Sequence, residues 1–219
     1  MTSLAIIGGT GTQGRALAAR FAKGGVPLFI GSRDVERGAA VAQALNERFD
    51  INTVQGMSNR DAAQAADVVM LAVPYAGMQP ILEDLRDVAS GKIVINIASS
   101  LNPEKRTRAL VHPKGSITAE IQEFFGEGTR VLAAFQHISP EKLESEEVID
   151  SDVLVCGGDR DAREKVIALG QQAGFDMYDA GLLPNAVALE TFTAVLIWMN
   201  VKYKVKGAGI RLTSVPRDL

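Results

Sequence analysis

Short apolar runs alternate with segments of helical periodicity along most of this 219-residue chain. Each run lies between polar or glycine-rich turns, as expected of strands buried in a parallel sheet. The predicted strands are Leu4–Ile7, Leu28–Ile30, Ile51–Val54, Val68–Val73, Ile93–Ile97, Arg130–Phe135, Val153–Cys156 and Met177–Ala180.

The segments between these runs repeat their apolar positions every three or four residues, which indicates helices. The predicted helices are Arg15–Lys23, Asp34–Glu47, a short helix opened by the capping box Ser58–Asp61, Met78–Val88, Thr118–Phe125, Asp161–Gly174 and Pro184–Tyr203. Strands that alternate with helices form βαβ units. We therefore predict an α/β fold with a doubly wound, mostly parallel sheet of the Rossmann type.

The alternation stops near Gly181, where a long apolar helix begins. We expect a Rossmann-type domain over residues 1–181 and a small helical C-terminal domain over residues 182–219. Ser99–Pro113 is predicted to be a polar loop, and it carries the cations Lys105, Arg106 and Arg108.

Composition narrows the class of protein. The chain is 47% hydrophobic and 22% charged, with a formal net charge of −3, so it can bury a core and has no basic excess for nucleic acid. The single cysteine, Cys156, excludes an intramolecular disulfide and is expected to pack in a strand. A lone cysteine also suggests a reducing compartment.

No signal peptide is recognisable, and Glu190 and Asn200 interrupt the apolar stretch Ala186–Val201. That stretch is shorter than the roughly 20 residues of a membrane span, so we expect a cytoplasmic protein.

A glycine-rich turn joins the first strand to the first helix. Gly9, Gly11 and Gly14 fit the pattern G-x-G-x-x-G. In this context one glycine makes the tight turn, one lets the backbone approach a pyrophosphate, and one lets helix and strand pack closely. The free amides at the helix N-terminus then face the phosphates, which predicts a dinucleotide site.

The end of the second strand indicates which dinucleotide binds. NAD sites place an acidic residue there, whereas this chain has Ser32 and Arg33, with Arg37 one helical turn further on. A guanidinium group suits a 2′-phosphate, so the residues favour NADP. Asp34 comes too late for the NAD role and is expected to cap the next helix.

Two further strand ends border the predicted cofactor path. Tyr75 after the fourth strand and Ser99 after the fifth are either cofactor contacts or ordinary turn residues. His137 follows a strand and is either a hydrogen-bonded structural residue or an acid–base group, and His112 is expected on the surface. The spacing of histidine, cysteine and carboxylates indicates no metal site. We assign no catalytic side chain, which suits a reaction that aligns two redox partners.

Taken together, the motifs resemble the F420-dependent NADP oxidoreductase family (NADPH:F420 reductases) over essentially the whole chain. The resemblance rests on Gly8–Gly14, Gly31–Arg33, Val73–Tyr75, His137 with Pro140, Val155–Gly157, Asp179–Gly181 with Asn185, Glu190 and Thr193, and Gly207–Ile210. The segment Asn96–Leu101 is more polar than in the family.

The resemblance implies hydride transfer between NADP(H) and the deazaflavin coenzyme F420, held in a cleft between the two domains. It implies that Thr10, Thr12, Gln13, Ser32, Arg33 and Arg37 hold the phosphates of NADP, beside Gly9, Gly11 and Gly14 of the cofactor-binding turn. Val73, Pro74, Tyr75, Gln79, Ala98, Ser99 and Leu101 would line the nicotinamide half, and His137, Ile138 and Ala208 would border the deazaflavin.

The resemblance also implies a homodimer or higher homo-oligomer that meets through Pro184–Tyr203. Two alternatives to F420 reduction stay open at this point. One is an NADPH-dependent reductase with a flavin, a ferric complex or a small carbonyl as acceptor. The other is a non-catalytic module that senses NADP.

Overall fold

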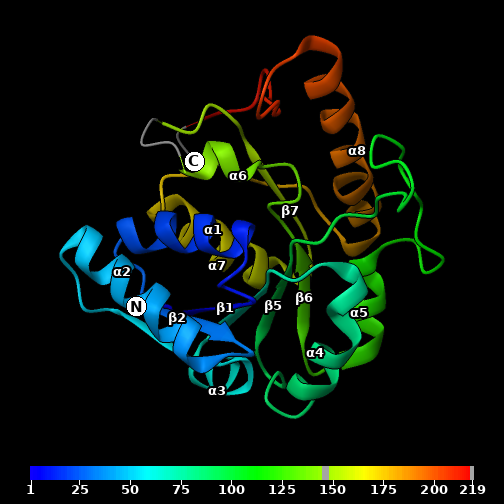
Figure 1. Cartoon of the computed structure of the whole chain (residues 1–219). Helices are drawn as coiled ribbons and strands as arrows, with labels where there is room; N and C mark the ends of the chain where they lie inside the picture. The colour runs from blue at the N-terminus through cyan, green and yellow to red at the C-terminus, as the bar shows by residue number, and fades with distance from the viewer. Residues whose placement is uncertain (145–147, 218–219) are drawn as a thin grey trace.

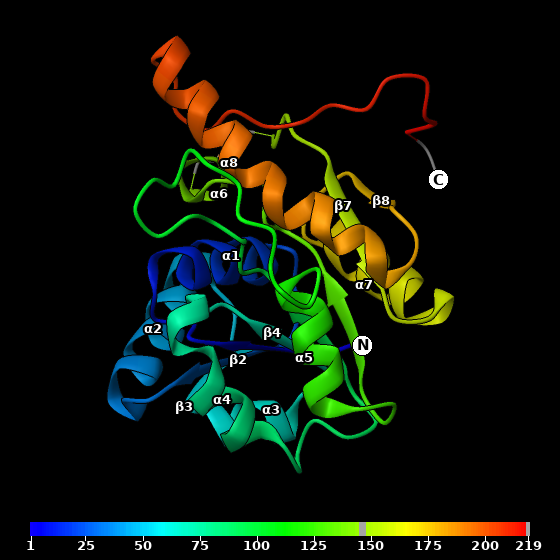
Figure 2. The same cartoon turned by 90° about the vertical axis from the view of Figure 1, so that its right-hand side faces the viewer.

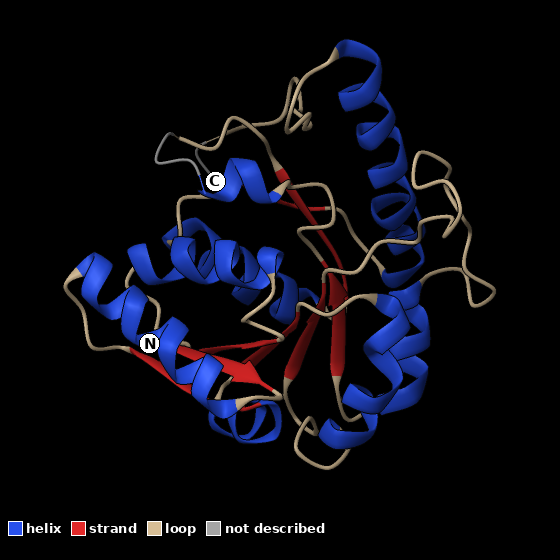
Figure 3. Cartoon of the chain, viewed as in Figure 1, coloured by secondary structure: helices blue, strands red, loops and turns tan. Residues whose placement is uncertain are grey.

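The computed structural model describes residues 1–144 and 148–217, so the last two residues of the predicted C-terminal domain lie outside the described part. Its strands form one eight-stranded sheet in the order β3-β2-β1-β4-β5-β6-β7-β8 (Figure 3). All neighbours run parallel except β6 and β7, which are antiparallel. The predicted mostly parallel Rossmann-type sheet is confirmed.

The strands occupy the predicted positions with one marked shift. They are β1 (Leu4–Ile7), β2 (Leu28–Ser32), β3 (Val54–Ser58), β4 (Val68–Leu71), β5 (Ile93–Asn96), β6 (Arg130–Ala133), β7 (Val153–Gly157) and β8 (Met177–Asp179). The prediction of a strand at Ile51–Val54 was wrong in its bounds. β3 is an edge strand that pairs with β2 alone, and Gly56 and Ser58 weaken its apolar pattern.

The helices also match the predicted pattern. They are α1 (Thr12–Lys23), α2 (Val35–Phe49), α3 (Asn59–Ala65), α4 (Met78–Leu85), α5 (Ile117–Phe125), α6 (Pro140–Glu144), α7 (Arg160–Gln172) and α8 (Ala186–Tyr203), with 3₁₀ turns η1 (Tyr75–Gly77) and η2 (Leu183–Asn185). The pattern missed α6 and η1, which are both shorter than the window that shows periodicity. The capping box is present, since Ser58 accepts a hydrogen bond from the Asp61 amide.

The alternation of side chains along β1 divides the core into two layers. Leu4 and Ile6 pack with residues of α1, α2 and α7, whereas Ala5 and Ile7 pack with α3, α4 and α5 on the other face. Successive side chains of a strand point to opposite faces, so a fully apolar strand needs helices on both sides. Figure 1 shows the resulting three layers.

α8 projects beyond the sheet and leads into a tail that returns across the start of β7 (Figures 1 and 2). Asp152, which is fully buried, holds this tail: it accepts hydrogen bonds from the Arg211 side chain, the Leu212 amide and the Arg217 side chain. Within the described residues, none of the helices combines the length and apolar character that a membrane crossing requires.

A candidate cofactor cleft

A cleft of about 860 Å³ follows the carboxyl ends of the central strands. It begins at the glycine turn after β1, passes the ends of β4, β5 and β6, and reaches α8 and the tail. The strand order reverses between β1 and β4, and open α/β sheets bind ligands at such a switch point. Twelve predicted residues line the cleft: Gly11, Thr12, Gln13, Val73, Pro74, Tyr75, Ala98, Ser99, Leu101, His137, Ile138 and Ala208.

The glycine turn is built for close approach. A Cβ on Gly14 would lie 2.7 Å from the Gly8 carbonyl oxygen, so only glycine fits there. α1 begins at Thr12, earlier than predicted, because the turn runs directly into the helix. Its N-cap, Gly11, offers no capping side chain, and the first turn holds no acidic residue. The amides at this helix end are therefore available for an anion.

Thr10 and Ser32 connect the glycine turn to the end of β2. Their hydroxyl oxygens lie 3.5 Å apart, and the buried Ser32 Oγ also accepts from the Asp34 amide at 3.2 Å. Arg33 and Arg37 follow with exposed side chains. Asp34 caps α2 by accepting from the Arg37 amide at 3.1 Å, as predicted. The end of β2 thus carries a hydroxyl that meets the glycine turn, followed by two exposed arginines.

Gln79 differs from the other residues predicted for the nicotinamide half. It lies exposed on α4, where its amide donates to Glu83 at 2.9 Å, and it does not line the cleft. Ser99 does line the cleft, and its hydroxyl lies 2.9 Å from Thr193 Oγ1 on α8.

His137 is a buried residue, bonded to the backbone of β7. Its Nε2 lies 2.9 Å from the Asp152 carbonyl oxygen and 3.3 Å from the Leu154 amide nitrogen, which donates toward it. Burial lowers the pKa of His137 to about 4, so the ring is neutral at pH 7. Its Nδ1 and the Oε1 of the neighbouring Gln136 are buried without a partner among the described residues. Both residues line the cleft, so these unpartnered polar atoms are suited to a ligand.

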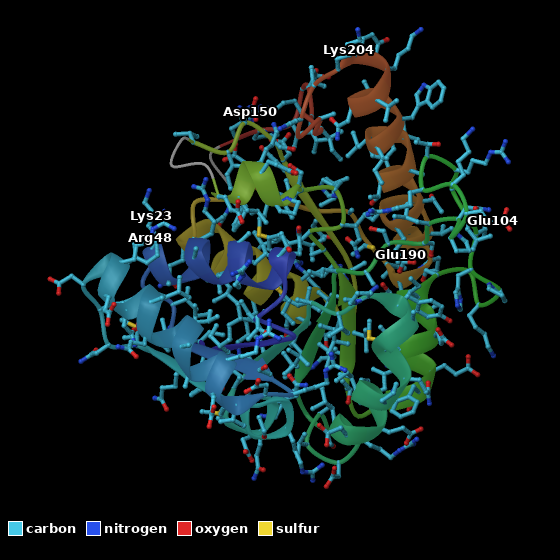
Figure 4. The ribbon with its side chains drawn as sticks, in the orientation of Figure 1. Lys23, Arg48, Glu104, Asp150, Glu190 and Lys204 are labelled. Carbon is cyan, nitrogen blue, oxygen red and sulfur yellow. The ribbon has the colours of Figure 1, made fainter. Side chains whose placement is uncertain are left out.

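Glu190 is a central residue for which the sequence predicted no role, although it interrupts an apolar stretch and is one of the residues that carry the family resemblance. It is fully buried at the end of α8 that faces α5 (Figure 4). Its carboxylate accepts from Ser100 Oγ at 2.8 Å and from the amides of Ile117 and Thr118 at 2.8 Å each, together with Thr118 Oγ1 at 2.7 Å. These donors include the N-terminus of α5, where a negative charge is favourable. Glu190 therefore fixes α8 against the loop that carries Ser99.

His112 was predicted to lie on the surface, and this was wrong. Its side chain is 10% exposed. Its Nε2 lies 2.8 Å from the hydroxyl of Tyr75 and 3.3 Å from Glu120 Oε2. Local sequence patterns could not indicate these contacts, because the partners of His112 come from η1 and α5.

A second hollow of equal volume lies between α1, α2 and α6, away from the strand ends. None of the predicted site residues lines it, so the cleft is the better candidate. The described residues contain no cluster of three or more potential metal ligands of the histidine, cysteine or carboxylate type. Cys156 lies fully buried in β7, as expected, and burial raises the pKa of its thiol to about 12.

Comparison with known proteins agrees with this geometry. Residues 3–100 match the family model described as NADP oxidoreductase, coenzyme F420-dependent. The F420-dependent NADP reductase of Methanocaldococcus jannaschii is 38% identical over 97% of this chain and 98% of the relative. The enzyme of the same name from Methanothermobacter thermautotrophicus is 39% identical over 98% of this chain and 96% of the relative.

A solved structure extends the agreement to the fold. The crystal structure of a proposed F420-dependent NADP reductase from Arthrobacter superposes with a TM-score of 0.82 and covers 97% of this chain and 100% of that one, at 23% identity. The two reductases at 38% and 39% identity confirm the resemblance carried by the sequence motifs: the chain belongs to the F420-dependent NADP oxidoreductase family.

Proposed function

We propose that this protein transfers hydride between NADP(H) and the deazaflavin coenzyme F420. The observation that carries the proposal is the single cleft that joins a phosphate-binding turn to a partly apolar pocket beneath α8. One cleft with two differently built ends suits two cofactors that meet face to face. The F420-dependent NADP reductases named above support the choice of acceptor.

The residues at one end fit NADP. The uncapped start of α1 offers amides to the pyrophosphate, and Gly14 keeps the turn tight. Ser32, Arg33 and Arg37 would hold the 2′-phosphate, with Thr10 beside them. Thr12 and Gln13 line the cleft at this end, and the Gln13 amide donates to the Ile138 carbonyl at 2.9 Å, which links the two halves.

The residues at the other end fit a flat, largely apolar ring with a few polar edges. Apolar contact comes from Ile138, Leu196 and Ala208. The unpartnered Nδ1 of His137 and Oε1 of Gln136 offer two hydrogen-bonding atoms to the polar edges of the ring. The bound cofactors supply the hydride chemistry themselves. The protein orients the two rings, excludes water from between them and keeps His137 neutral, so catalysis comes mainly from proximity.

A spectrophotometric assay tests the proposal. Purified protein is mixed with NADPH and oxidised F420, and loss of the deazaflavin's visible absorption is followed, with NADH as the alternative donor and FMN and ferric citrate as alternative acceptors. We expect rapid loss with NADPH and F420 only. Rapid reduction of FMN or ferric citrate, without F420 reduction, would identify a different acceptor. NADPH binding with no reduction of any acceptor would favour an NADP sensor.

We further propose that the protein is a homodimer in the cytoplasm. α8 exposes several large apolar side chains, which a second copy of the chain would cover: Val195, Trp198, Val201 and Tyr203. A lone cysteine suits a reducing compartment. Residues 182–219 would then act as a small domain that both closes the cleft and forms the contact. Sedimentation velocity measures the mass, and Trp198→Glu is expected to shift it toward the monomer.

A further inference from the structure

Tyr75, His112 and Glu120 form a chain of polar contacts at one wall of the cleft. The pKa of the Tyr75 phenol is raised by burial and by its hydrogen bond to the Glu120 carboxylate. His112 Nδ1 accepts from the Lys114 amide at 3.2 Å, which leaves the ring proton on Nε2. Nε2–H then points to the Tyr75 oxygen at 2.8 Å, with Glu120 Oε2 3.3 Å from the same nitrogen, and the phenol is hydrogen-bonded to the Glu120 carboxylate. The phenol is thus fixed by one donor and one acceptor.

The backbone of Tyr75 does little to hold this ring. Tyr75 lies in the three-residue turn η1, and it is 43% exposed. The ring lines the cleft on one side and meets the His112 ring edge-on, with centroids 5.3 Å apart. Without the two hydrogen bonds the Tyr75 side chain would be free to change rotamer. The network therefore holds the ring in one position before a ligand binds.

The segment that carries His112 is itself fastened at its two ends. Its start is held to α8, because the Ser100 hydroxyl donates to the Glu190 carboxylate at 2.8 Å. Its far end turns tightly at His112, where the Gly115 amide donates to the His112 carbonyl at 2.8 Å. Between these points Arg106 reaches the cleft from the exposed part of the loop. His112 is therefore where the loop and the wall of the cleft are joined.

We propose that His112 is a positioning residue: it holds the Tyr75 ring and the 99–116 loop against the nicotinamide half of the cleft before NADPH binds. This inference rests on the proposed function for its choice of cofactor. Preorganisation of this kind lowers the entropic cost of binding, so its loss should weaken NADPH binding more than it slows turnover.

The test is a double-mutant cycle with Tyr75→Phe and His112→Ala. Each single variant should raise the dissociation constant for NADPH about tenfold, the factor worth one hydrogen bond of the stronger kind. The double variant should bind no more weakly than the weaker single variant, because both changes break the same contact. KM for NADPH should rise in step, whereas kcat and KM for F420 stay within about twofold.

Two further variants control the result. His112→Gln places an amide N–H near the position of Nε2 and should restore most of the NADPH affinity. Lys114→Ala breaks the neighbouring surface pair with Glu123 at 2.9 Å and should leave NADPH affinity unchanged. NADPH binding is measured by fluorescence without any acceptor, so the result stands apart from the choice of acceptor. Unchanged NADPH affinity in folded His112→Ala, or additive losses in the double variant, would overturn the proposal.

Discussion

The buried carboxylate of Glu190 gives the sharpest test of how this fold is held together. It accepts the amides of Ile117 and Thr118, each at 2.8 Å, and the Ser100 hydroxyl, also at 2.8 Å. Since the side chain is fully buried, water cannot replace it as an acceptor. Substitution at this position therefore leaves donors without partners.

The magnitude depends on how many donors each substitution leaves unpaired. Glu190→Gln keeps one oxygen for Thr118, and Ser100 can turn to accept from the new amide, but the Ile117 N–H is left facing an N–H. One unpaired buried amide costs about 1–3 kcal/mol. Glu190→Leu keeps the volume but leaves both amides unpaired, so it should cost about 2–6 kcal/mol, a large share of the 5–15 kcal/mol typical of a folded domain.

Urea unfolding followed by circular dichroism measures these free energies. We expect the order parent, Glu190→Gln, Glu190→Leu from most to least stable, with equal denaturant slopes. Glu123→Gln is a matched control, because that carboxylate is 62% exposed and pairs with Lys114 on the surface; it should stay within about 0.5 kcal/mol of the parent. Parental stability in Glu190→Gln, or a Leu variant no less stable than the Gln variant, would refute the reasoning.

Three shorter predictions follow. Gly14→Ala forces a Cβ to 2.7 Å from Gly8 O, so NADPH affinity measured by titration should fall at least about tenfold. Cys156, with a pKa of about 12, should react with a thiol reagent only after denaturation, as counted by absorbance. His137 has a folded pKa of about 4 against an ordinary value of 6.5, so below pH 6.5 only the unfolded chain takes up the proton. Stability should therefore be full above pH 6.5 and fall by about 3 kcal/mol as the pH drops toward 4, a loss that His137→Gln should reduce.

The sheet could be predicted from the sequence because each buried strand is marked by its own run of apolar residues. β1 and β4 are fully apolar runs next to glycine or proline, and burial on both faces requires that pattern. β3 was misplaced because an edge strand is only half covered, so its residues need not be apolar. The glycine turn was also predictable, because all of its residues lie within the short segment Gly8–Gly14.

The cleft wall was less predictable because its contacts join distant segments. The sequence separation between Tyr75 and His112 is 37 residues, and that between Ser99 and Thr193 is 94. A histidine in a polar loop and a serine after a strand carry no mark of such partners. Gln79 shows the converse, since its position near the site in sequence did not bring its side chain into the cleft.

α8 shows how one polar residue can orient an otherwise apolar helix. Its apolar side chains are distributed around the whole helix, so hydrophobicity alone selects no face. A buried carboxylate is tolerated only where several donors converge, and the N-terminus of α5 with Ser100 provides them. That requirement turns Glu190 inward, and Thr193 follows one turn later, where it lines the cleft. The same rotation leaves Trp198, which is 51% exposed, on the outward face of α8.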